Sequence, residues 1–256
     1  MDRVNVLGVG IDPLTLDQLL ANILESVAQA RRLLITHANV TGLNLAYHQD
    51  WLRDFYKRCD LVYCDGMGVM LGARWLGLGI PERYTLADWA WQLAERAAQQ
   101  GATLYLLGNP PGVAEQAGEK LRQRYPSLRI AGAQHGFFDK APGCSENQAV
   151  LEKINAAHPD ILLVGFGMPL QERWLKENWP GLNARVAITC GALFEYLSGD
   201  LRRGPRWMTQ AYLEWLARLL ISPRRYARRY LRDLPLFTYR ISKQKFIPGC
   251  VEGVND

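Results

Sequence analysis

Short apolar runs alternate with longer amphipathic stretches along almost the whole chain. The runs have the length of a β-strand, and the stretches between them are long enough to form helices. The expected strands are residues 4–9, 33–36, 61–64, 103–107, 129–131, 161–165 and 186–190. Strands that alternate with helices of about ten or more residues build a mainly parallel sheet with helices on both faces. The sequence therefore predicts a Rossmann-like α/β fold.

Several of the expected helices have recognisable starts. Thr15 with Gln18, Thr85 with Asp88 and Ser145 with Gln148 each place a capping hydroxyl three residues before a side chain that can reach back to it. We expect a helix to begin directly after each of the three hydroxyl residues.

The C-terminal part of the chain differs from the rest in its charge. Residues 202–232 contain nine arginines, no lysine and a single acid, Glu214, so this segment carries about +8 while the whole chain carries +5. We therefore divide the chain into a Rossmann-like α/β domain, residues 1–200, and a C-terminal arginine-rich helical appendage, residues 201–256. Arginine forms forked hydrogen bonds with phosphate or carboxylate, and the interleaved Trp and Tyr residues suit a membrane interface or stacking on bases. The alternative is an ordinary helix whose leucines pack on the core and whose arginines face water.

Composition limits the setting in which the protein works. No run approaches 18 apolar residues and the first residues lack the apolar core of a signal peptide, so we expect a cytoplasmic protein whose membrane contact is peripheral. The five cysteines form no C-x-x-C pair, and the four histidines show no H-E-x-x-H spacing. A protein-built metal site and a bound cofactor are therefore not expected.

Ligands of open parallel sheets bind at the carboxyl ends of the strands, so the residues that follow each strand are the candidates for a site. Five of the seven expected strands end in glycine or a short polar group. The candidates are Thr36, His37, Asn39, Asp65, Gly108, Gly165, Gly167, Gln171, Glu172 and Glu195. Each also has a structural alternative: Asp65 and Asn39 could cap helices, and Gln171 with Glu172 could be an ordinary first helical turn. Cys64 and Cys190 fit small core residues better than nucleophiles.

Common nucleotide-binding motifs are absent. The Gly8-Val9-Gly10 and Gly165-Phe166-Gly167 runs lack the third glycine of G-x-G-x-x-G, because Pro13 and Leu170 occupy those positions. No G-x-x-x-x-G-K-[ST] and no Asp-x-Asp is present either. A dinucleotide oxidoreductase and a P-loop hydrolase are disfavoured. If a diphosphate leaves at this site, arginine must neutralise it.

The chain carries an ordered set of short motifs, namely DGMG (65–68), PER (81–83), LLG (106–108), HGFF (135–138), GFGMPLQE (165–172), GDLRRGP (199–205), LEWLARL (213–219) and PRR (223–225). Together these motifs resemble the WecG/TagA/CpsF glycosyltransferase family, from about Val4 to Leu236. The resemblance implies an inverting, metal-independent transferase that moves N-acetylmannosamine or a related sugar from a UDP-sugar donor to a polyprenyl-diphosphate-linked sugar. Such an enzyme works at the inner face of the bacterial cell membrane in cell-surface polysaccharide synthesis.

The resemblance also implies roles for individual residues. Asp65 matches the general base of the family, Arg83 and Gln171 match its functional arginine and glutamine, and Asn39 matches the asparagine of its T-x-N motif. The arginines of the appendage match the segment that docks on the anionic membrane and closes over the lipid diphosphate. The candidates for that role are Arg203, Arg218, Arg224, Arg225, Arg228 and Arg229.

Two departures from the family pattern concern the donor. His37 stands where the family usually has Thr, with Thr36 one position away, and Glu195 replaces the usual Asp. Two rival interpretations of the arginine segment remain, a nucleic-acid-binding protein and a non-catalytic peripheral membrane protein, although the net acidic remainder of the chain argues against nucleic acid. The donor sugar, the acceptor and the oligomeric state stay open.

Overall fold

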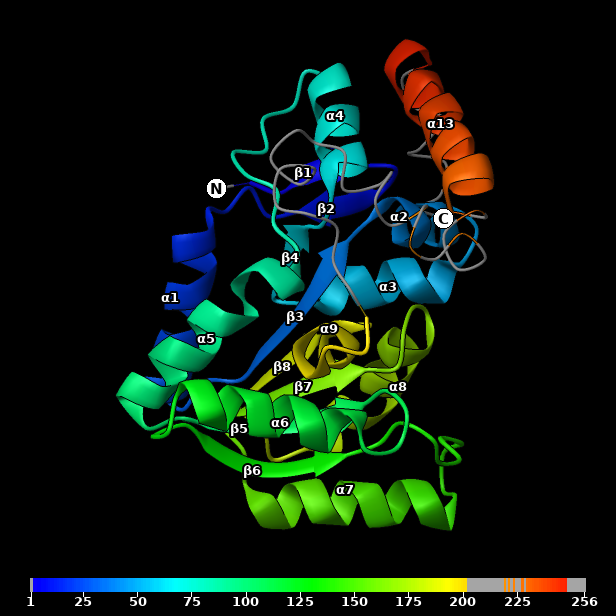
Figure 1. Ribbon diagram of the computed structural model, residues 1–256. Coiled ribbons are helices and arrows are strands. Elements are labelled where there is room, and N and C mark those ends of the chain that lie inside the picture. Colours follow the sequence, from blue (N-terminus) through cyan, green and yellow to red (C-terminus); the bar gives the residue numbers. More distant parts are fainter. Residues whose placement is uncertain are drawn as a thin grey trace.

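The computed structural model describes residues 2–201 and 229–247, together with Leu219, Ile221, Pro223 and Ala227 (Figure 1). Five of the candidate arginines of the appendage, namely Arg203, Arg218, Arg224, Arg225 and Arg228, lie outside the described residues, as does the side chain of Arg229. Most of the predicted helical appendage, residues 201–256, lies outside the described residues too. The proposed division at residue 200 therefore stays a prediction.

Six parallel strands form the central sheet, in the order β4-β3-β8-β7-β5-β6. They are β3 (Leu33–Ala38), β4 (Leu61–Cys64), β5 (Thr103–Gly108), β6 (Arg129–Gln134), β7 (Ile161–Gly165) and β8 (Val186–Thr189). All six runs were predicted, to within three residues at their ends. The predicted α/β class with a parallel sheet is therefore confirmed.

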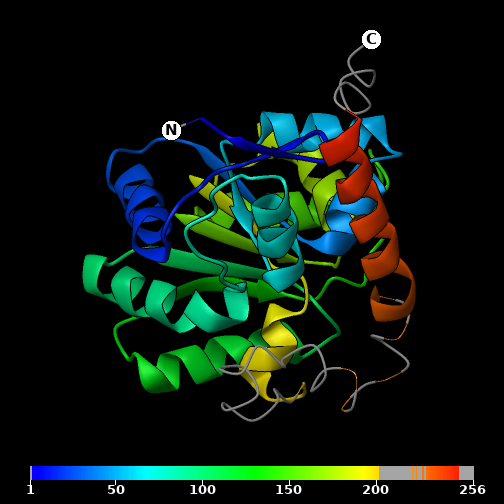
Figure 2. The ribbon, with the colours of Figure 1, turned by 90° about the horizontal axis from the view of Figure 1, so that it is seen from above.

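Helices cover both faces of this sheet, as predicted (Figures 1 and 2). One layer contains α1 (Leu16–Ala28), α5 (Leu86–Gln100), α6 (Val113–Arg124) and α9 (Leu193–Ser198), and the other contains α2 (Val40–Ala46), α3 (Asp50–Arg58), α7 (Ser145–Ala157) and α8 (Leu170–Asn178). Alternation along β5 shows how one strand serves both layers. Leu104 and Leu106 are buried against the first layer of helices, while Tyr105 and Leu107 are buried against the second. Successive side chains of a strand point to opposite faces of the sheet.

The predicted strand 4–9 is wrong, because the chain reverses within it. The structure has a separate hairpin there, with β1 (Val4–Val6) paired antiparallel to β2 (Val9–Ile11). Leu7 and Gly8 connect the strands and both have positive φ, 53° and 81°, as a tight two-residue hairpin turn requires. The amide of Gly8 also donates to Asn5 Oδ1 at 2.9 Å, which helps to hold the turn.

Two of the three predicted helix starts are confirmed. Thr15 and Thr85 both form capping boxes, with Gln18 and Asp88 as the reciprocal side chains. The prediction for Ser145 is wrong, because α7 already begins at that residue and Cys144 is its N-cap.

The predicted C-terminal helical appendage includes a helix that packs against the α/β domain. After a short helical turn, η2 (Arg229–Asp233), α13 (Leu234–Phe246) lies along α2 and α4 (Met67–Trp75). Phe237 and Ile241 are buried in the core next to α4, and a Cβ on Gly72 would lie 2.7 Å from the Phe237 ring. The small size of Gly72 therefore permits the close approach of the two helices. No helix among the described residues has the length and hydrophobicity needed to span a bilayer.

Candidate active site

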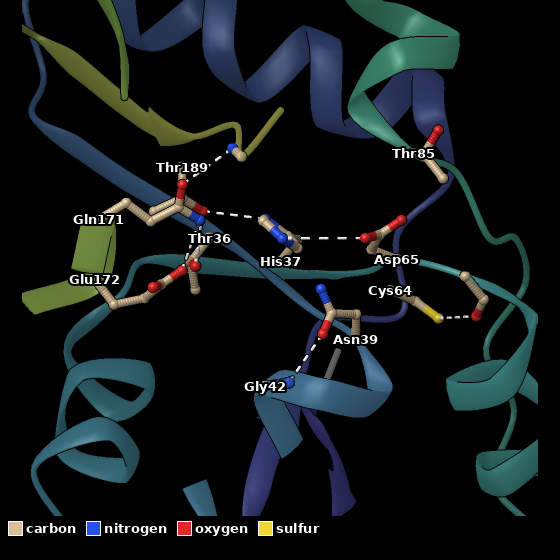
Figure 3. Close-up of polar contacts among 12 residues, drawn as sticks. Thr36, His37, Asn39, Gly42, Cys64, Asp65, Thr85, Gln171, Glu172 and Thr189 are labelled. Carbon is tan, nitrogen blue, oxygen red and sulfur yellow. Dashed lines mark hydrogen bonds and ion pairs between the residues drawn. The ribbon is translucent and has the colours of Figure 1, made fainter. Parts of the chain in front are cut away.

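A cavity of about 240 Å³ opens at the carboxyl ends of β3, β4, β7 and β8, the edge where the sequence predicts a ligand site. Four of the predicted residues line it, namely His37, Asn39, Asp65 and Gln171 (Figure 3). Thr85, Leu86 and Ala87 at the start of α5 line it too. The parallel sheet thus brings together side chains that lie up to 134 positions apart in the sequence.

Asp65 directly follows β4 and projects into the cavity. Its side chain is 18% exposed, and its Oδ2 lies 4.0 Å from Nε2 of His37. The cap interpretation of Asp65 is wrong, because Gly66 is the N-cap residue of α4 and no side chain in the described part of the chain caps that helix. The carboxylate therefore has no capping role and faces the cavity from a partly buried position.

The imidazole of His37 is held by a residue that we did not single out from the sequence. His37 Nδ1 lies 3.1 Å from the hydroxyl of Thr189, the last residue of β8, and that hydroxyl also contacts Thr36 Oγ1 at 2.9 Å. Thr36 is fully buried between the strands and is not among the described residues that line the cavity. The structure thus places His37 at the cavity wall and Thr36 behind it, in a row of side chains that orients the ring towards Asp65.

Asn39 combines both roles considered for it. Its Oδ1 accepts a hydrogen bond of 2.9 Å from the Gly42 amide, so the cap interpretation is confirmed for α2. Its amide nitrogen lies on the side of His37 and Asp65 (Figure 3). The cap fixes the side chain and leaves the amide nitrogen facing the cavity.

Gln171 connects the cavity to a buried carboxyl group. Its Oε1 accepts a hydrogen bond of 3.0 Å from the amide of Gly191, and its Nε2 donates to Glu172 Oε1 at 2.8 Å. Glu172 is completely buried, and its Oε2 has no hydrogen-bond partner among the described residues. Glu172 therefore lies behind Gln171, away from the cavity, and holds the amide of Gln171 in one orientation.

Burial raises the pKa of Glu172 to about 7, against the stabilising effect of the hydrogen bond from Gln171. Because the pKa is raised above its unfolded value, the folded protein binds more protons than the unfolded chain between about pH 4.5 and pH 7. The free energy of unfolding should therefore fall by about 3 kcal/mol as the pH rises through this window.

Replacing Glu172 with Gln should remove this loss of stability. We expect the Glu172→Gln variant to be more stable than the wild type at pH 8 and to show a flatter dependence of Tm on pH between 4.5 and 7. Glu152→Gln, which changes an exposed carboxylate on α7, is the control and should keep the wild-type pH dependence. Equal slopes in the wild type and Glu172→Gln would contradict the buried, protonatable carboxyl group.

A second cavity, of about 710 Å³, adjoins the first and shares Gly191 and Ala192 with it. It contains three predicted residues, Gly165, Gly167 and Glu195, and also Asn109 and Lys140, which we did not single out. Aromatic side chains form part of its wall, namely Phe137, Phe138 and Phe166. The Lys140 ammonium group lies 4.7 Å from the centroid of the Phe166 ring, and burial lowers its pKa. This cavity combines flat apolar surface with polar groups at its edge.

Gly108 is a predicted site residue with a structural reason for being glycine. Its φ is +141°, and a Cβ there would lie 2.3 Å from the carbonyl oxygen of Gly165. It is not among the described residues that line either cavity. Gly108 therefore allows β5 and β7 to end side by side beneath the second cavity.

Arg83 lies in the loop between α4 and α5. Its Nη1 is 4.0 Å from Asp88 Oδ2, and its side chain is largely buried. It is close enough to Cys64 to affect the pKa of that thiol. Arg83 is not among the described residues that line the two cavities, so the structure places it beside the strand end that carries Asp65.

Cys64 and Cys190 are buried core residues, as we expected from the sequence. Burial raises the pKa of Cys64 to about 12 and that of Cys190 well above its usual value, so neither is a ready nucleophile. Among the residues that the structure describes, no group of three or more His, Cys, Asp or Glu side chains could hold a metal ion.

The two ends of the arginine-rich segment are fixed beside the cavities. At its start, the amide of Leu201 donates to the carbonyl of Glu195, which lines the second cavity. At its end, Asp233 Oδ2 accepts a hydrogen bond of 2.9 Å from Thr41, which lines the first cavity, and the Asp233 carbonyl accepts one from Asn44. Thr41 and Asp233 carried no recognisable signal in the sequence, because their pairing spans 192 positions.

The chain is similar to known proteins over almost its whole length. The model of the glycosyl transferase WecG/TagA/CpsF family matches residues 4–249. The chain is 30% identical over 246 residues to an N-acetylglucosaminyldiphosphoundecaprenol N-acetyl-beta-D-mannosaminyltransferase of Staphylococcus aureus strain MRSA252, covering 95% of this chain and 93% of the relative. The equivalent proteins of strains NCTC 8325 and MW2 are 30% and 29% identical with the same coverage.

Proposed function

Because the chain belongs to the WecG/TagA/CpsF family of glycosyl transferases, we propose that it moves N-acetylmannosamine or a related hexose from a UDP-sugar to a polyprenyl-diphosphate-linked sugar. The product would enter bacterial cell-surface polysaccharide synthesis. The names of the relatives support the transferred sugar and the lipid-linked acceptor. The observation that carries the proposal is the Asp65 carboxylate, which projects into a cavity at the carboxyl ends of the strands beside a second, larger cavity.

The donor would span both cavities. The aromatic walls and the carboxylate of Glu195 in the second cavity suit a uracil ring and ribose hydroxyls, and its glycines admit a close approach of the backbone. The sugar would then cross Gly191 and Ala192, which belong to both cavities, and reach the space between Asn39 and Asp65.

Asp65 would act as the general base. Its carboxylate takes the proton from the acceptor hydroxyl, the acceptor oxygen forms a bond to the anomeric carbon, and the bond from that carbon to the UDP oxygen breaks on the opposite face. The configuration at the anomeric carbon is thereby inverted. His37 at 4.0 Å would orient the carboxylate, and its position where the family usually has Thr makes it a candidate for donor selectivity.

Arginine would stabilise the charge that grows on the leaving diphosphate without a metal ion. Arg83 lies beside the strand end that carries Asp65, and the first residues of α5 line the first cavity, where the N-terminus of a helix favours an anion. The arginines of the appendage would supply further positive charge, since the segment that contains them starts and ends at residues next to the cavities. They would also bind the lipid diphosphate and the anionic membrane surface on the cytoplasmic side.

Binding of UDP tests the donor part of the proposal. We expect a saturable rise in Tm when UDP is added to the full chain, because a ligand that binds only the folded state stabilises it. The rise should persist in EDTA. A chain that binds DNA or RNA in a strongly salt-dependent manner, with no response to UDP, would instead favour a nucleic-acid-binding protein.

A further inference from the structure

Glu172 is an acid at a position where it makes folding less favourable. It is completely buried on α8, and its Oε2 has no hydrogen-bond partner among the described residues. Burial and, next, the charge of Glu172 raise the pKa of Tyr56 and of Cys59, so both residues of α3 lie close to it. The Tyr56 hydroxyl already donates to the His37 carbonyl at 3.2 Å and so cannot also donate to Oε2. Burying an ionisable group with an unsatisfied oxygen costs stability.

The other oxygen of Glu172 selects one orientation of the Gln171 amide. Gln171 is also completely buried, and its Nε2 donates to Glu172 Oε1 while its Oε1 accepts from the Gly191 amide (Figure 3). A carboxylate accepts hydrogen bonds and does not donate them, so Glu172 requires the nitrogen of Gln171 on its side. Turned over, Gln171 would place its nitrogen against the N–H of Gly191, donor against donor. Glu172 therefore determines that Gln171 offers an acceptor to Gly191.

The Gly191 peptide is held from two sides at the boundary between the cavities. Its amide is bonded to Gln171, and its carbonyl oxygen packs on Gly165, where a Cβ would lie 2.7 Å from it. Its φ is +55°, in the left-handed region that favours glycine. Gly191 and Ala192 line both cavities. The orientation of this peptide therefore shapes the passage from one cavity to the other.

We propose that Glu172 is a positioning residue for sugar transfer: it orients Gln171, and Gln171 holds the Gly191 peptide where the donor sugar crosses between the cavities. This inference rests on the proposed function, which places the donor across both cavities. It gives a reason for an acid at a position where an apolar side chain would fold better, because groups that order an active site are often kept at the expense of stability.

Two substitutions separate the hydrogen bond of Glu172 from its packing. Glu172→Gln keeps an oxygen that can accept from Gln171, whereas Glu172→Met has a similar length and no such acceptor. Glu177→Met makes the same change at an exposed position of α8 and is the control. At pH 8 Glu172→Met loses one hydrogen bond but also the unfavourable burial of a carboxylate. These effects oppose each other, so its Tm should stay close to that of the wild type.

Hydrogen exchange of the Gly191 amide reports directly on this chain of hydrogen bonds. Cys190-Gly191 is the only Cys-Gly pair in the sequence, so carbonyl-13C cysteine combined with 15N glycine gives a single HNCO signal for the full chain. We expect this amide to be equally protected in the wild type, Glu172→Gln and Glu177→Met. In Glu172→Met it should exchange about fivefold faster or more, the effect of losing one hydrogen bond.

Transfer of sugar to the lipid-linked acceptor should follow the same order. We expect it to fall about 10-fold to 100-fold in Glu172→Met, the scale for a displaced reacting group, and to stay within about twofold of the wild type in Glu172→Gln. The loss should fall on kcat. The UDP-dependent rise in Tm should be retained, because the uracil and ribose would lie in the second cavity while Gly191 borders the path of the sugar.

The exchange measurement separates this inference from the proposed function. A wild type with neither transfer nor a response to UDP would overturn the proposed function, yet the expected contrast in exchange would still support Glu172 as the residue that orients Gly191. Wild-type exchange and transfer in Glu172→Met would overturn the inference. Equal losses of transfer in Glu172→Gln and Glu172→Met would also overturn it, because the carboxyl group itself would then be required. A large fall in the Tm of Glu172→Met would assign Glu172 to packing instead.

Discussion

Asp65→Asn should reduce sugar transfer by about 100-fold to 10,000-fold, the range that a positioned general base contributes. Asparagine has nearly the same shape as aspartate but cannot accept the proton of the acceptor hydroxyl. Because Gly66 rather than Asp65 caps α4, the substitution removes no helix cap and the fold should be retained. The measurement is release of UDP in the presence of acceptor, together with the rise in Tm that UDP produces.

Asp54→Asn provides the matched control for this prediction. Asp54 is an exposed residue of α3, and the same change of carboxylate to amide there should leave transfer unchanged. The UDP-dependent rise in Tm should survive in both variants, because the proposed role of Asp65 is to take the proton from the acceptor hydroxyl and not to bind UDP. Wild-type turnover by Asp65→Asn would remove Asp65 from the role of base.

Replacing Arg224, Arg225, Arg228 and Arg229 with Gln should weaken binding to anionic vesicles by about 1,000-fold. Each basic residue near an anionic leaflet contributes about 1 kcal/mol, so four contribute about 4 kcal/mol, and each 1.4 kcal/mol is a factor of ten. Transfer to a lipid-linked acceptor should fall by at least about 100-fold, the scale for losing one preorganised electrostatic group. Substitution is preferable to truncation, because truncation would also remove Phe237 and Ile241 from the core.

The control for the arginine variant carries the same change of charge elsewhere. Replacing Lys120, Arg122, Arg129 and Lys153 with Gln also lowers the net charge from +5 to +1, at exposed positions of α6, β6 and α7. If vesicle binding depended on net charge alone, both variants would lose it equally. Equal losses would therefore contradict a specific docking role for the appendage.

The sheet was predictable because its strands are short apolar runs. A run such as residues 161–165 is typical of a strand that is buried on both faces of a parallel sheet. The hairpin of residues 4–11 was not, because the turn at Leu7 places a leucine at positive φ, where sequence preferences argue against it. The appendage was predicted to be helical, but the bounds of α13 within it were not predicted, for a related reason. Its buried Phe237 and Ile241 are accompanied by exposed Leu234, Tyr239 and Phe246, so its apolar residues mark no single face.

The candidate site was predictable to the extent that it follows the strand ends. His37, Asn39, Asp65 and Gln171 meet at one cavity because the carboxyl ends of parallel strands share an edge of the sheet. Glu172 follows Gln171 directly, yet the turn of α8 carries it into the interior. Contacts such as that between Thr41 and Asp233 depend on how distant segments pack, which neither periodicity nor motifs contain.

The most direct test of the central claim is transfer of sugar by the full chain. The wild type would be incubated with UDP-N-acetylmannosamine and a short-chain prenyl-diphosphate-linked N-acetylglucosamine, in EDTA, and the products analysed by mass spectrometry and NMR. We predict a lipid-linked disaccharide with a β linkage, inverted relative to the α-linked donor, and one UDP for each disaccharide. The absence of transfer from every UDP-hexose tested on this acceptor, or a product with retained configuration, would contradict the account.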